Sequence, residues 1–531
     1  MELISLQFFF FLAGLLAVYY AVGRLAHKSQ WIVLLVGSLA FYCLMGGAST
    51  LIYAVAVALV TWGAGLGLDR LHQADKTARK QAKGRDAKKA VKRAFTRKRR
   101  VVLVLALAAC VGILGYFKYW NVLLFYAGRT ESTTSLGILL PLGISFYIFQ
   151  SLGYLIDSYN AKYPPQRNFA RHLLFVTYFP QIIQGPINRH TTLDPQLFEV
   201  HHADGDHIER GLLRLGFGML KKIAVANVLS NVVDTVFVQA AGPHIPGSLA
   251  IFGVVVYSIQ MYADFSGGID IVEGVSELFG IEMDQNFRQP YFSVSLADFW
   301  RRWHMSLGAW MRDYVFYPLA VTSPSRNFGK WAGKHLGKHA GRTLPACVAN
   351  IIVFLLVGLW HGAELHYIAW GLYNGVIVAA SDLCAPLFNK LAEVTHVRRE
   401  SAGFRLFAIA RTFAVVCVGR FFDCFARTSD SFFAIRNIVT GTGYGPLRDS
   451  LVAYGATYAD ELGFPVPVWA ALAIIFAVDV LYERGTDVRA AVLGWRLPVR
   501  VAVYVTIILV VAAGAAYDTT GGGGGFLYAN F

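Results

Sequence analysis

Charge is scarce in this 531-residue chain: Asp, Glu, Lys and Arg make up 15% of it, against about 25% in a soluble domain. Apolar residues make up 56% and the mean hydropathy is +0.48. They come in long blocks such as 101–117 and 501–516, and about 20 apolar residues span a bilayer. The composition excludes a soluble enzyme, a secreted disulfide scaffold and a disordered protein. It predicts an all-α, polytopic helical membrane protein.

Several catalytic signatures are missing. The chain has no GxSxG elbow, no Walker GK[ST], no GxGxxG after a strand and no HExxH, which removes support for serine hydrolysis, ATP coupling and zinc proteolysis. Its six cysteines are scattered in or beside apolar segments without a CxxC pair. We interpret them as small buried hydrophobic residues.

The apolar blocks indicate the number of membrane spans. We expect roughly 10–12 true spans among them, since some blocks will be re-entrant or interfacial. No domain boundary is visible, so residues 1–531 are predicted to form a single transmembrane domain. The blocks lie near 5–22, 31–45, 49–68, 101–127, 136–156, 169–187, 211–239, 247–265, 344–360, 365–388, 403–425, 466–482 and 499–517.

The net charge of +15 comes mainly from one segment. Residues 70–100 hold 14 Lys and Arg against Asp75 and Asp86, which leaves 34 basic and 31 acidic residues elsewhere. Basic loops beside a membrane lie in the cytoplasm and contact anionic lipid. We therefore predict a polybasic cytoplasmic loop at 70–100, with the N-terminus outside. No nucleic-acid-binding signature accompanies it, so no nucleic-acid partner is expected.

A second basic segment, 322–343, is also predicted to be cytoplasmic. Its glycine-lysine pairs recur every four residues, which would place Lys330, Lys334 and Lys338 on one face of a juxtamembrane helix. His335 and His339 have the spacing of a metal pair, but no acidic ligand lies nearby and the setting is cationic. A solvated basic face is favoured, and we predict no metal site here or at the histidine-rich loop 201–207.

Three histidines, His304, His361 and His366, lie among aromatic and apolar residues. If 295–319 is helical, His304 shares a face with Gly308 and lies one turn above Trp300. His361 ends an apolar run between Gly358 and Gly362, where a backbone or a ligand can approach closely. A buried neutral imidazole is suited to removing a proton from a hydroxyl. On composition alone, two hydrogen-bonded structural histidines remain the favoured alternative.

Several long motifs, taken in order, resemble the membrane-bound O-acyltransferase family. Within it, the closest likeness is to the bacterial branch of alginate O-acetylation and teichoic-acid D-alanylation proteins. The stretch after the YPL of 317–319 departs from the alginate branch, and the 70–100 segment is unusually long. The motifs lie at 140–160, 173–189, 262–319, 356–375 and 419–438, and in the terminal FLYANF.

The resemblance implies a ring of tilted helices around a central tunnel. It implies that His361 of the WHG motif is catalytic and that His304 of the RRWHxS motif is the second functional histidine. With this family in view, His304, Trp300 and Trp303 are candidate donors to a carbonyl oxyanion. The residues that we expect to line or hold the tunnel are Trp300, Arg302, Trp303, Trp360, Asp264 and Asn286.

The resemblance also implies an activity. An acyl group, most plausibly acetyl, passes from a cytoplasmic thioester to a hydroxyl of an extracellular or cell-wall polysaccharide. The donor, acetyl-CoA or an acyl-carrier protein, is a substrate, and no tightly bound cofactor is expected. An outer-face partner of the SGNH-hydrolase type and a bacterial plasma-membrane location are implied as well. The alternatives are D-alanyl transfer to teichoic acid and, in another class, a transporter or flippase.

Overall fold

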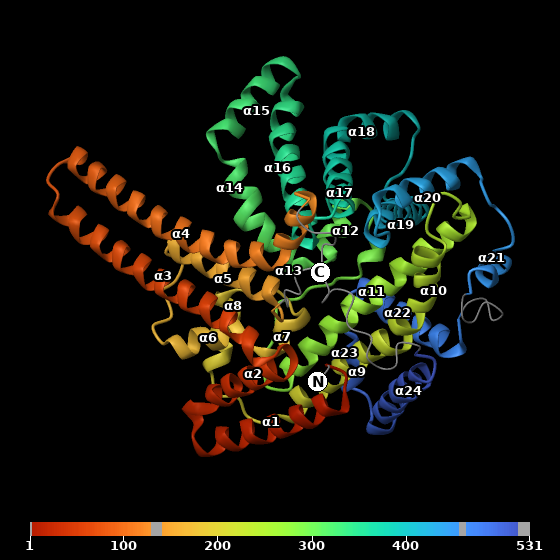
Figure 1. Ribbon diagram of the computed structural model, residues 1–531, viewed down its shortest axis with the longest axis horizontal. Coiled ribbons are helices and arrows are strands. Elements are labelled where there is room, and N and C mark those ends of the chain that lie inside the picture. Colours follow the sequence, from red (N-terminus) through yellow and green to blue (C-terminus); the bar gives the residue numbers. More distant parts are fainter. Residues whose placement is uncertain (1–2, 129–140, 456–463, 519–531) are drawn as a thin grey trace. The chain divides into compact units, whose positions relative to one another are not determined.

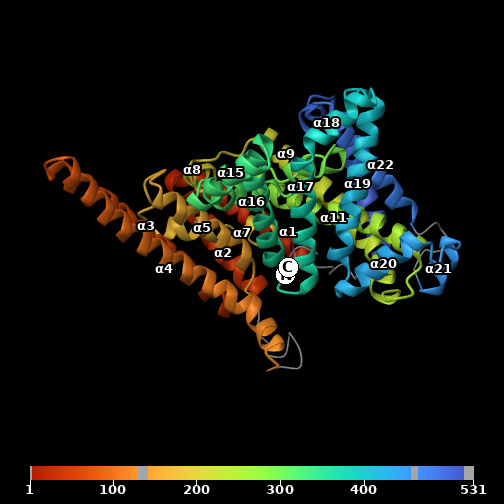
Figure 2. The same cartoon turned by 90° about the horizontal axis from the view of Figure 1, so that it is seen from above.

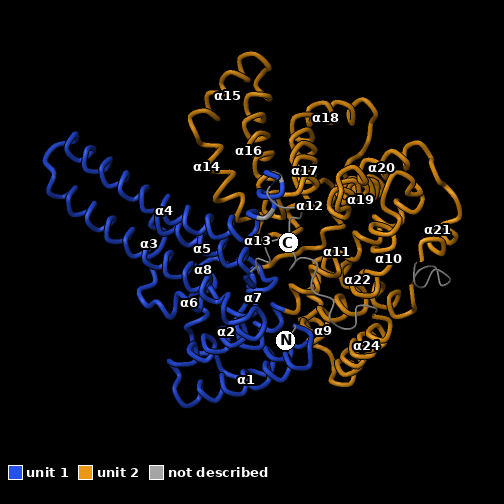
Figure 3. Tube along the Cα trace, in the orientation of Figure 1, with its two compact units in different colours: residues 1–212, 272–284 blue, residues 213–271, 285–531 orange. Residues whose placement is uncertain are grey.

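The computed structural model describes residues 3–128, 141–455 and 464–518. Every regular element in these ranges is a helix, which confirms the all-α prediction (Figure 1). The chain forms two compact units: residues 1–212 with 272–284, and residues 213–271 with 285–531 (Figure 3). The single-domain organisation stays a prediction, and the FLYANF terminus lies outside the described residues.

Unit 1 begins with long apolar helices and continues with shorter ones. Helix α5 is only 16 residues long and nearly all of it is buried, so it is a core helix. The short turn η1 (His27–Ser29) links the first two helices. The helices of unit 1 before α9 are α1 (Leu6–Leu25), α2 (Gln30–Gly46), α3 (Ala48–Gln81), α4 (Arg85–Tyr126), α5 (Ile144–Tyr159), α6 (Phe169–Thr177), α7 (Phe179–Gln184) and α8 (His190–Phe198).

Helices α9 (Gly205–Lys221) and α11 (Gly247–Glu277) contribute residues to both units. Between them lie the π-helical turn η2 (Lys222–Asn227), α10 (Val228–Asp234) and the π-helical turn η3 (Thr235–Gln239). The remaining elements of unit 2 are η4 (Pro290–Phe292), α12 (Leu296–Arg302), α13 (Met305–Met311), the π-helical turn η5 (Arg312–Phe316), α14 (Tyr317–Ala320), α15 (Ser323–His335), α16 (Lys338–His361), α17 (Leu365–Leu383), α18 (Ala385–Val394), α19 (Ala402–Cys424), α20 (Thr428–Thr440), α21 (Leu447–Ala453), α22 (Val466–Glu483), α23 (Val488–Leu493) and α24 (Leu497–Ala515).

In the described ranges, nine helices are long and apolar enough to cross a membrane, or ten if the bent pair α17 and α18 counts as one span. The chain is thus a multi-pass membrane protein. The higher count reaches the lower end of the expected range. The apolar blocks near 136–156, 169–187 and 211–239 account for the difference, because they form short or interrupted helices.

The predicted loop at 70–100 is largely helical. Helices α3 and α4 continue through it, and only 82–84 separate them. They form a long antiparallel hairpin in unit 1, drawn in orange in Figures 1 and 2. The apolar runs of the sequence do not predict these helical extensions, because the outer part of each helix is polar.

The prediction for the second basic segment is wrong for Lys338. Helix α15 ends at His335, and α16 starts after Gly337, whose φ is +92°. The four-residue repeat instead places glycines where α15 and α16 meet. A Cβ on Gly341 would lie 2.6 Å from the Cα of Gly333, so only glycine permits this contact.

Candidate active site

The RRWH segment is not one continuous helix. Helix α12, capped by the Ser295 hydroxyl, ends at Arg302, and His304 adopts a left-handed conformation with φ +47° before α13 begins. This backbone region is rare for a residue with a Cβ and concentrates at functional sites. The continuous helix on which the predicted shared face of Trp300, His304 and Gly308 depends is therefore not formed, although the Gly308 N–H donates to the His304 carbonyl at 3.0 Å at the start of α13.

Asn286 holds this break in place. Its side-chain Oδ1 accepts hydrogen bonds from the Ser306 N–H at 3.1 Å, from the Ser306 hydroxyl at 2.9 Å and from His304 Nδ1 at 3.1 Å. Its backbone carbonyl accepts from the N–H of Met305 at 2.9 Å. The sequence predicted that Asn286 holds the geometry of the tunnel but did not indicate its contacts. We call these four hydrogen bonds of Asn286 the clamp.

The clamp determines the tautomer of His304. A backbone N–H can only donate, so the amide atom that faces Ser306 must be the oxygen. An oxygen can only accept, so Nδ1 of His304 carries the proton and Nε2 carries the lone pair. Nε2 is therefore a proton acceptor and not a donor, which argues against His304 as an oxyanion donor.

Burial keeps this imidazole neutral. His304 is 2% exposed, and the Phe265 ring meets it edge-on at a centroid distance of 4.9 Å. Desolvation lowers the pKa of His304 to about 3, since an apolar setting disfavours the charged form. A group with so low a pKa accepts a hydrogen bond well at neutral pH but removes a proton poorly.

His361 and His304 both contact the ring of Trp360. The Trp360 ring lies 6.2 Å from the His304 ring and 4.8 Å from the His361 ring, centroid to centroid. His361 ends α16, is 7% exposed, and packs against Trp370 at 5.3 Å and Tyr367 at 6.0 Å. The structure thus gathers the two predicted histidines around one indole.

The glycines that flank Trp360 and His361 allow close packing of protein on protein. A Cβ on Gly358 would lie 2.4 Å from the Tyr367 carbonyl oxygen, and one on Gly362 would lie 2.4 Å from the Tyr367 ring. The sequence left open whether a backbone or a ligand approaches these glycines. In the structure, the backbone and ring of Tyr367 in α17 approach them.

The predicted tryptophans Trp300, in α12, and Trp303, directly after it, have structural partners. Trp300 donates its Nε1–H to Asn374 Oδ1 at 3.1 Å and meets Trp370 edge-on at 5.4 Å, which joins α12 to α17. Trp303 is 2% exposed and stacks on Phe299 at 5.4 Å. Trp300 therefore has its only donor engaged, so it too is a poor candidate for an oxyanion donor.

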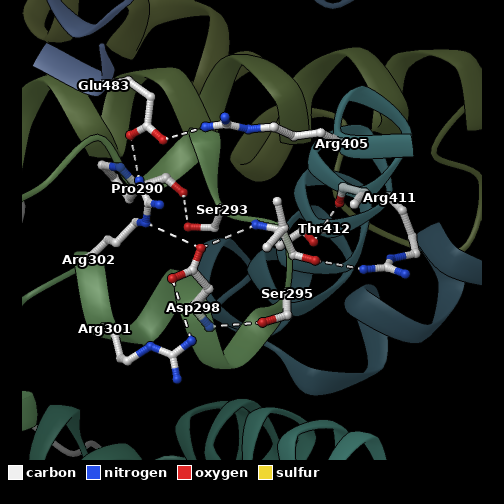
Figure 4. Close-up of polar contacts among 12 residues, drawn as sticks. Pro290, Ser293, Ser295, Asp298, Arg301, Arg302, Arg405, Arg411, Thr412 and Glu483 are labelled. Atoms are coloured by element: carbon white, nitrogen blue, oxygen red, sulfur yellow. Dashed lines mark hydrogen bonds and ion pairs between the residues drawn. The ribbon is translucent and has the colours of Figure 1, made fainter. Parts of the chain in front are cut away.

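Arg302 ties α12 to α22 (Figure 4). Its Nη1 contacts Glu483 at 2.7 Å and its Nε contacts Asp298 at 3.2 Å, while Arg405 binds the other Glu483 oxygen at 2.8 Å. Burial disfavours the guanidinium charge, but the attraction and hydrogen bonds of the two carboxylates outweigh it and raise the pKa of Arg302. Arg302 thus braces the segment that carries His304.

Asp264 forms a buried ion pair with Lys222. The Nζ–Oδ1 distance is 2.6 Å, and the side chains are 1% and 3% exposed. Charges buried this deeply in a span face protein and mark functional or packing-critical positions. Asp264 directly precedes Phe265, which contacts His304, so the pair anchors that part of α11 beside the site.

Sequence reasoning missed Arg420 on α19. Its guanidinium lies 4.7 Å from the centre of the Trp303 ring, and its Nη1 pairs with Asp423 at 2.7 Å. The side chain is 4% exposed. The signal was available, because an arginine inside the apolar block 403–425 is costly unless it has partners.

The two histidines of the second basic segment have backbone partners. His335 Nδ1 lies 2.8 Å from the Trp331 carbonyl and His339 Nε2 lies 3.1 Å from the Leu383 carbonyl, on two different helices. In the part of the chain that the structure describes, no three His, Cys, Asp or Glu side chains are grouped to hold a metal ion.

Comparison with known proteins matches residues 166–419 to the model of the membrane-bound O-acyltransferase family. The probable alginate O-acetylase AlgI of Pseudomonas syringae pv. tomato is 34% identical over 326 residues, 60% of this chain and 56% of that protein. The peptidoglycan O-acetyltransferase of Helicobacter pylori is 32% identical over 309 residues, 53% and 55% of the two chains. The teichoic acid D-alanyltransferase of Bacillus subtilis is 30% identical over 285 residues, 52% and 67% of the two chains.

The chain thus spans about half the length of the first two of these relatives and two thirds of the third. His304 and His361 both lie inside the matched region. With its multi-pass helices, the two buried histidines and these matches taken together, the chain belongs to the membrane-bound O-acyltransferase family.

Proposed function

We propose that this protein is a membrane O-acyltransferase. It transfers an acetyl group from a cytoplasmic thioester to a hydroxyl of an extracellular or cell-wall polysaccharide. The observation that carries the proposal is the pair of buried histidines that both contact Trp360, one of which is held with its Nε2 unprotonated. Two relatives named as acetyl-transferring proteins support acetyl as the acyl group.

His361 is the proposed general base. It takes the proton from the acceptor hydroxyl while the hydroxyl oxygen bonds to the thioester carbonyl carbon, a step that a positioned base accelerates about 10²–10⁴-fold. The tetrahedral intermediate then breaks its carbon–sulfur bond. The departing thiolate takes the proton from His361, which leaves an ester, a free thiol and a neutral histidine.

His304 has a different proposed role. With a pKa of about 3 it is too weak a base for the proton transfer. Its Nε2 instead accepts a hydrogen bond from a second, non-reacting hydroxyl of the polysaccharide, which aims the reacting hydroxyl oxygen at the carbonyl. Trp300 is engaged with Asn374, so Trp303 remains from the original set of candidate oxyanion donors.

The donor is either acetyl-CoA or an acyl-carrier protein, used as a substrate, with no tightly bound cofactor and no metal. We place the protein in a bacterial plasma membrane with its N-terminus outside, because 70–100 and 322–343 carry the excess of basic residues. The basic residues nearest the spans contact anionic lipid. An SGNH-type protein is the proposed partner at the outer face.

A second candidate is D-alanyl transfer from a carrier protein to teichoic acid. The relative from Bacillus subtilis, named as a teichoic acid D-alanyltransferase and covered over two thirds of its length, favours it. The chemistry at the two histidines would be the same, because D-alanine is also carried as a thioester and delivered to a hydroxyl. Only the acyl group and the acceptor differ.

The test compares cells with no copy, wild type, His361→Ala and His304→Ala at matched membrane expression. Base-labile esters released from the surface polysaccharide are identified by mass. Acetate that appears with wild type and vanishes with His361→Ala supports the proposal, and released D-alanine supports the second candidate. Ester at the wild-type level in the His361→Ala cells would return that histidine to a structural role.

A further inference from the structure

Helices α3 and α4 are much longer than a bilayer requires. With 34 and 42 residues, they are about 51 and 63 Å long at about 1.5 Å per residue, whereas the hydrocarbon core is about 30 Å thick. The apolar part of α3 ends at Leu68 and that of α4 begins at Val101. We call residues 69–100 the basic arm; Figure 2 shows it at the end of the hairpin.

The base of the basic arm is rigid. Asp75 of α3 is 1% exposed and pairs with Arg79 at 2.8 Å and with Arg99 of α4 at 3.2 Å. Arg99 also contacts His72, whose Nε2 lies 3.0 Å from the Tyr159 carbonyl of α5. These contacts join the two helices to each other and to α5. The base of the arm is therefore joined to the rest of unit 1, and the arm itself is helical except at 82–84.

The outer part of the arm presents a groove of positive charge between its two helices. The basic arm has three acidic residues: Asp69 lies at its base, Asp75 is buried, and Asp86 alone lies in the outer part. Seven basic residues and Gly84 line the groove: Lys76, Arg79 and Lys80 from α3, and Arg85, Lys88, Lys89 and Lys92 from α4.

The lengths of the two helices place the outer end of this groove beyond the lipid headgroups. Residues 69–81 and 85–100 extend about 20 and 24 Å beyond the apolar parts of their helices, and an average span tilt of about 20° shortens this by only about 6%. The headgroup layer is about 5–8 Å thick on each side. Surface potentials decay over about 8 Å at physiological salt, so the outer end of the groove, at Lys80, Arg85, Lys88 and Lys89, lies beyond most of the attraction of the lipid.

We propose that the groove is a docking site for an acidic folded protein of the cytoplasm, one that places an acidic helix between α3 and α4. The proposal takes only the cytoplasmic orientation from the proposed function. Charge complementarity carries it: a row of cations on two helices matches a helix that carries carboxylates. Phe95 is the only Phe, Tyr or Trp in the arm, so the surface lacks the stacking residues with which single-stranded nucleic acids are bound.

The test uses the full-length protein in phosphatidylcholine nanodiscs and a 20-residue helical peptide with glutamate on one face. The variant replaces Lys88, Lys89, Lys92 and Arg93 by Gln. The matched control replaces Lys330, Lys334, Lys338 and Arg342 by Gln, which removes the same charge from the other basic segment. We expect the arm variant to bind the peptide at least tenfold more weakly than wild type, and the control to stay within twofold. Equal loss in both would overturn the proposal.

Two further experiments distinguish the rival occupants of the groove. In nanodiscs with one third anionic lipid, hydrogen exchange of residues 76–92 should match that in neutral nanodiscs; strong protection by the anionic lipid would make the groove a lipid site. A photo-crosslinker in place of Lys88 should give protein adducts in cells, and the purified adduct partner must bind wild type and not the arm variant. Adducts to RNA alone would overturn the proposal.

The two tests fail separately. The substituted side chains of the arm are exposed and lie outside the apolar parts of the spans, so the arm variant should fold and be recovered from membranes at the wild-type level. If polysaccharide esters vanish in the His361→Ala cells while peptide binding is retained, the arm and the proposed activity are independent. Loss of peptide binding in the arm variant, with ester formation intact in vitro, likewise shows that the arm and the proposed activity are independent.

Discussion

The two histidine segments of unit 2 are positioned by different physical means. His304 stands at a break between α12 and α13, in a left-handed conformation, and hydrogen bonds to Asn286 orient its ring. His361 stands at the regular end of α16, and aromatic rings and close glycine contacts position it. Hydrogen bonding thus determines the tautomer of the first histidine and makes its Nε2 an acceptor, whereas ring packing and glycine contacts position the second.

The largest expected effect comes from exchanging the two histidines for a residue without a titratable ring. His361→Gln should lower the rate of acyl transfer about 10²–10⁴-fold because it removes the general base. His304→Gln should lower it less, because an amide can still accept a hydrogen bond from the non-reacting hydroxyl of the acceptor. Rates are measured in membranes with labelled acetyl-CoA. A larger loss for His304→Gln would reverse the assigned roles.

Substitution of the clamp should convert the first histidine into a titrating group. In the wild type the pKa of His304 is about 3, so no protonation of it limits activity between pH 5 and 8. Asn286→Asp keeps the acceptor but adds a negative charge, which raises the pKa of His304. Activity of the variant should then fall as the pH drops through the raised value. The pH–rate profile decides this, and a profile parallel to the wild type contradicts the clamp.

The same low pKa has a consequence for stability. An unfolded histidine takes up a proton near pH 6.5, whereas folded His304 does not until about pH 3. Acidification below about pH 6.5 therefore favours unfolding. The melting temperature in detergent should drop more between pH 7.5 and 5.5 for wild type than for His304→Gln.

Packing around the second histidine should be sensitive to a single methyl group. Gly358→Ala places a Cβ 2.4 Å from the Tyr367 carbonyl oxygen, and overpacking of this kind costs about 1–3 kcal/mol. Gly308→Ala is the matched control, because its Cβ would come no nearer than 3.6 Å to the Trp300 carbonyl. Thermal unfolding in detergent should show a lower melting temperature for the first variant and an unchanged or higher one for the second.

Arg420 should contribute through its shape as well as its charge. Arg420→Lys keeps the charge beside Asp423 but loses the planar contact with Trp303, and a buried cation–π contact is worth about 2 kcal/mol. We expect roughly tenfold lower turnover, with little change in the KM for the donor if Arg420 only positions Trp303 and His304. Arg427→Lys, at an exposed position on the same segment, serves as the control. A raised KM with normal turnover would instead place Arg420 in contact with the donor.

The smallest effect is expected at the brace between α12 and α22. Glu483→Gln weakens the contacts to Arg302 and Arg405, which are partly exposed, so the loss should be about 1 kcal/mol or less. Turnover should fall a few-fold, and the deficit of the variant relative to wild type should shrink at high salt because screening weakens the native pairs. Glu393→Gln, exposed on α18, is the control. Equal effects of both substitutions would remove the brace from the account.

The sequence by itself determined the class of the molecule. Long apolar blocks require helices that satisfy their own backbone hydrogen bonds in lipid, and this demand is local to each segment. The same holds for the identity of His304 and His361 as candidates, since polar residues within apolar surroundings are visible along the chain. The family motifs likewise lie in continuous stretches such as 262–319.

Tertiary structure alone decided what each candidate residue does. The break at His304 exists because Asn286, 18 residues earlier, supplies the hydrogen bonds that a continuous helix would have made. Arg302 is a brace because Glu483 lies beside it, 181 residues away. Repeated glycines at 329, 333 and 341 serve helix contact and not a lysine face, because α15 folds back on α16. Such roles depend on partners distant in sequence, and no local pattern encodes them.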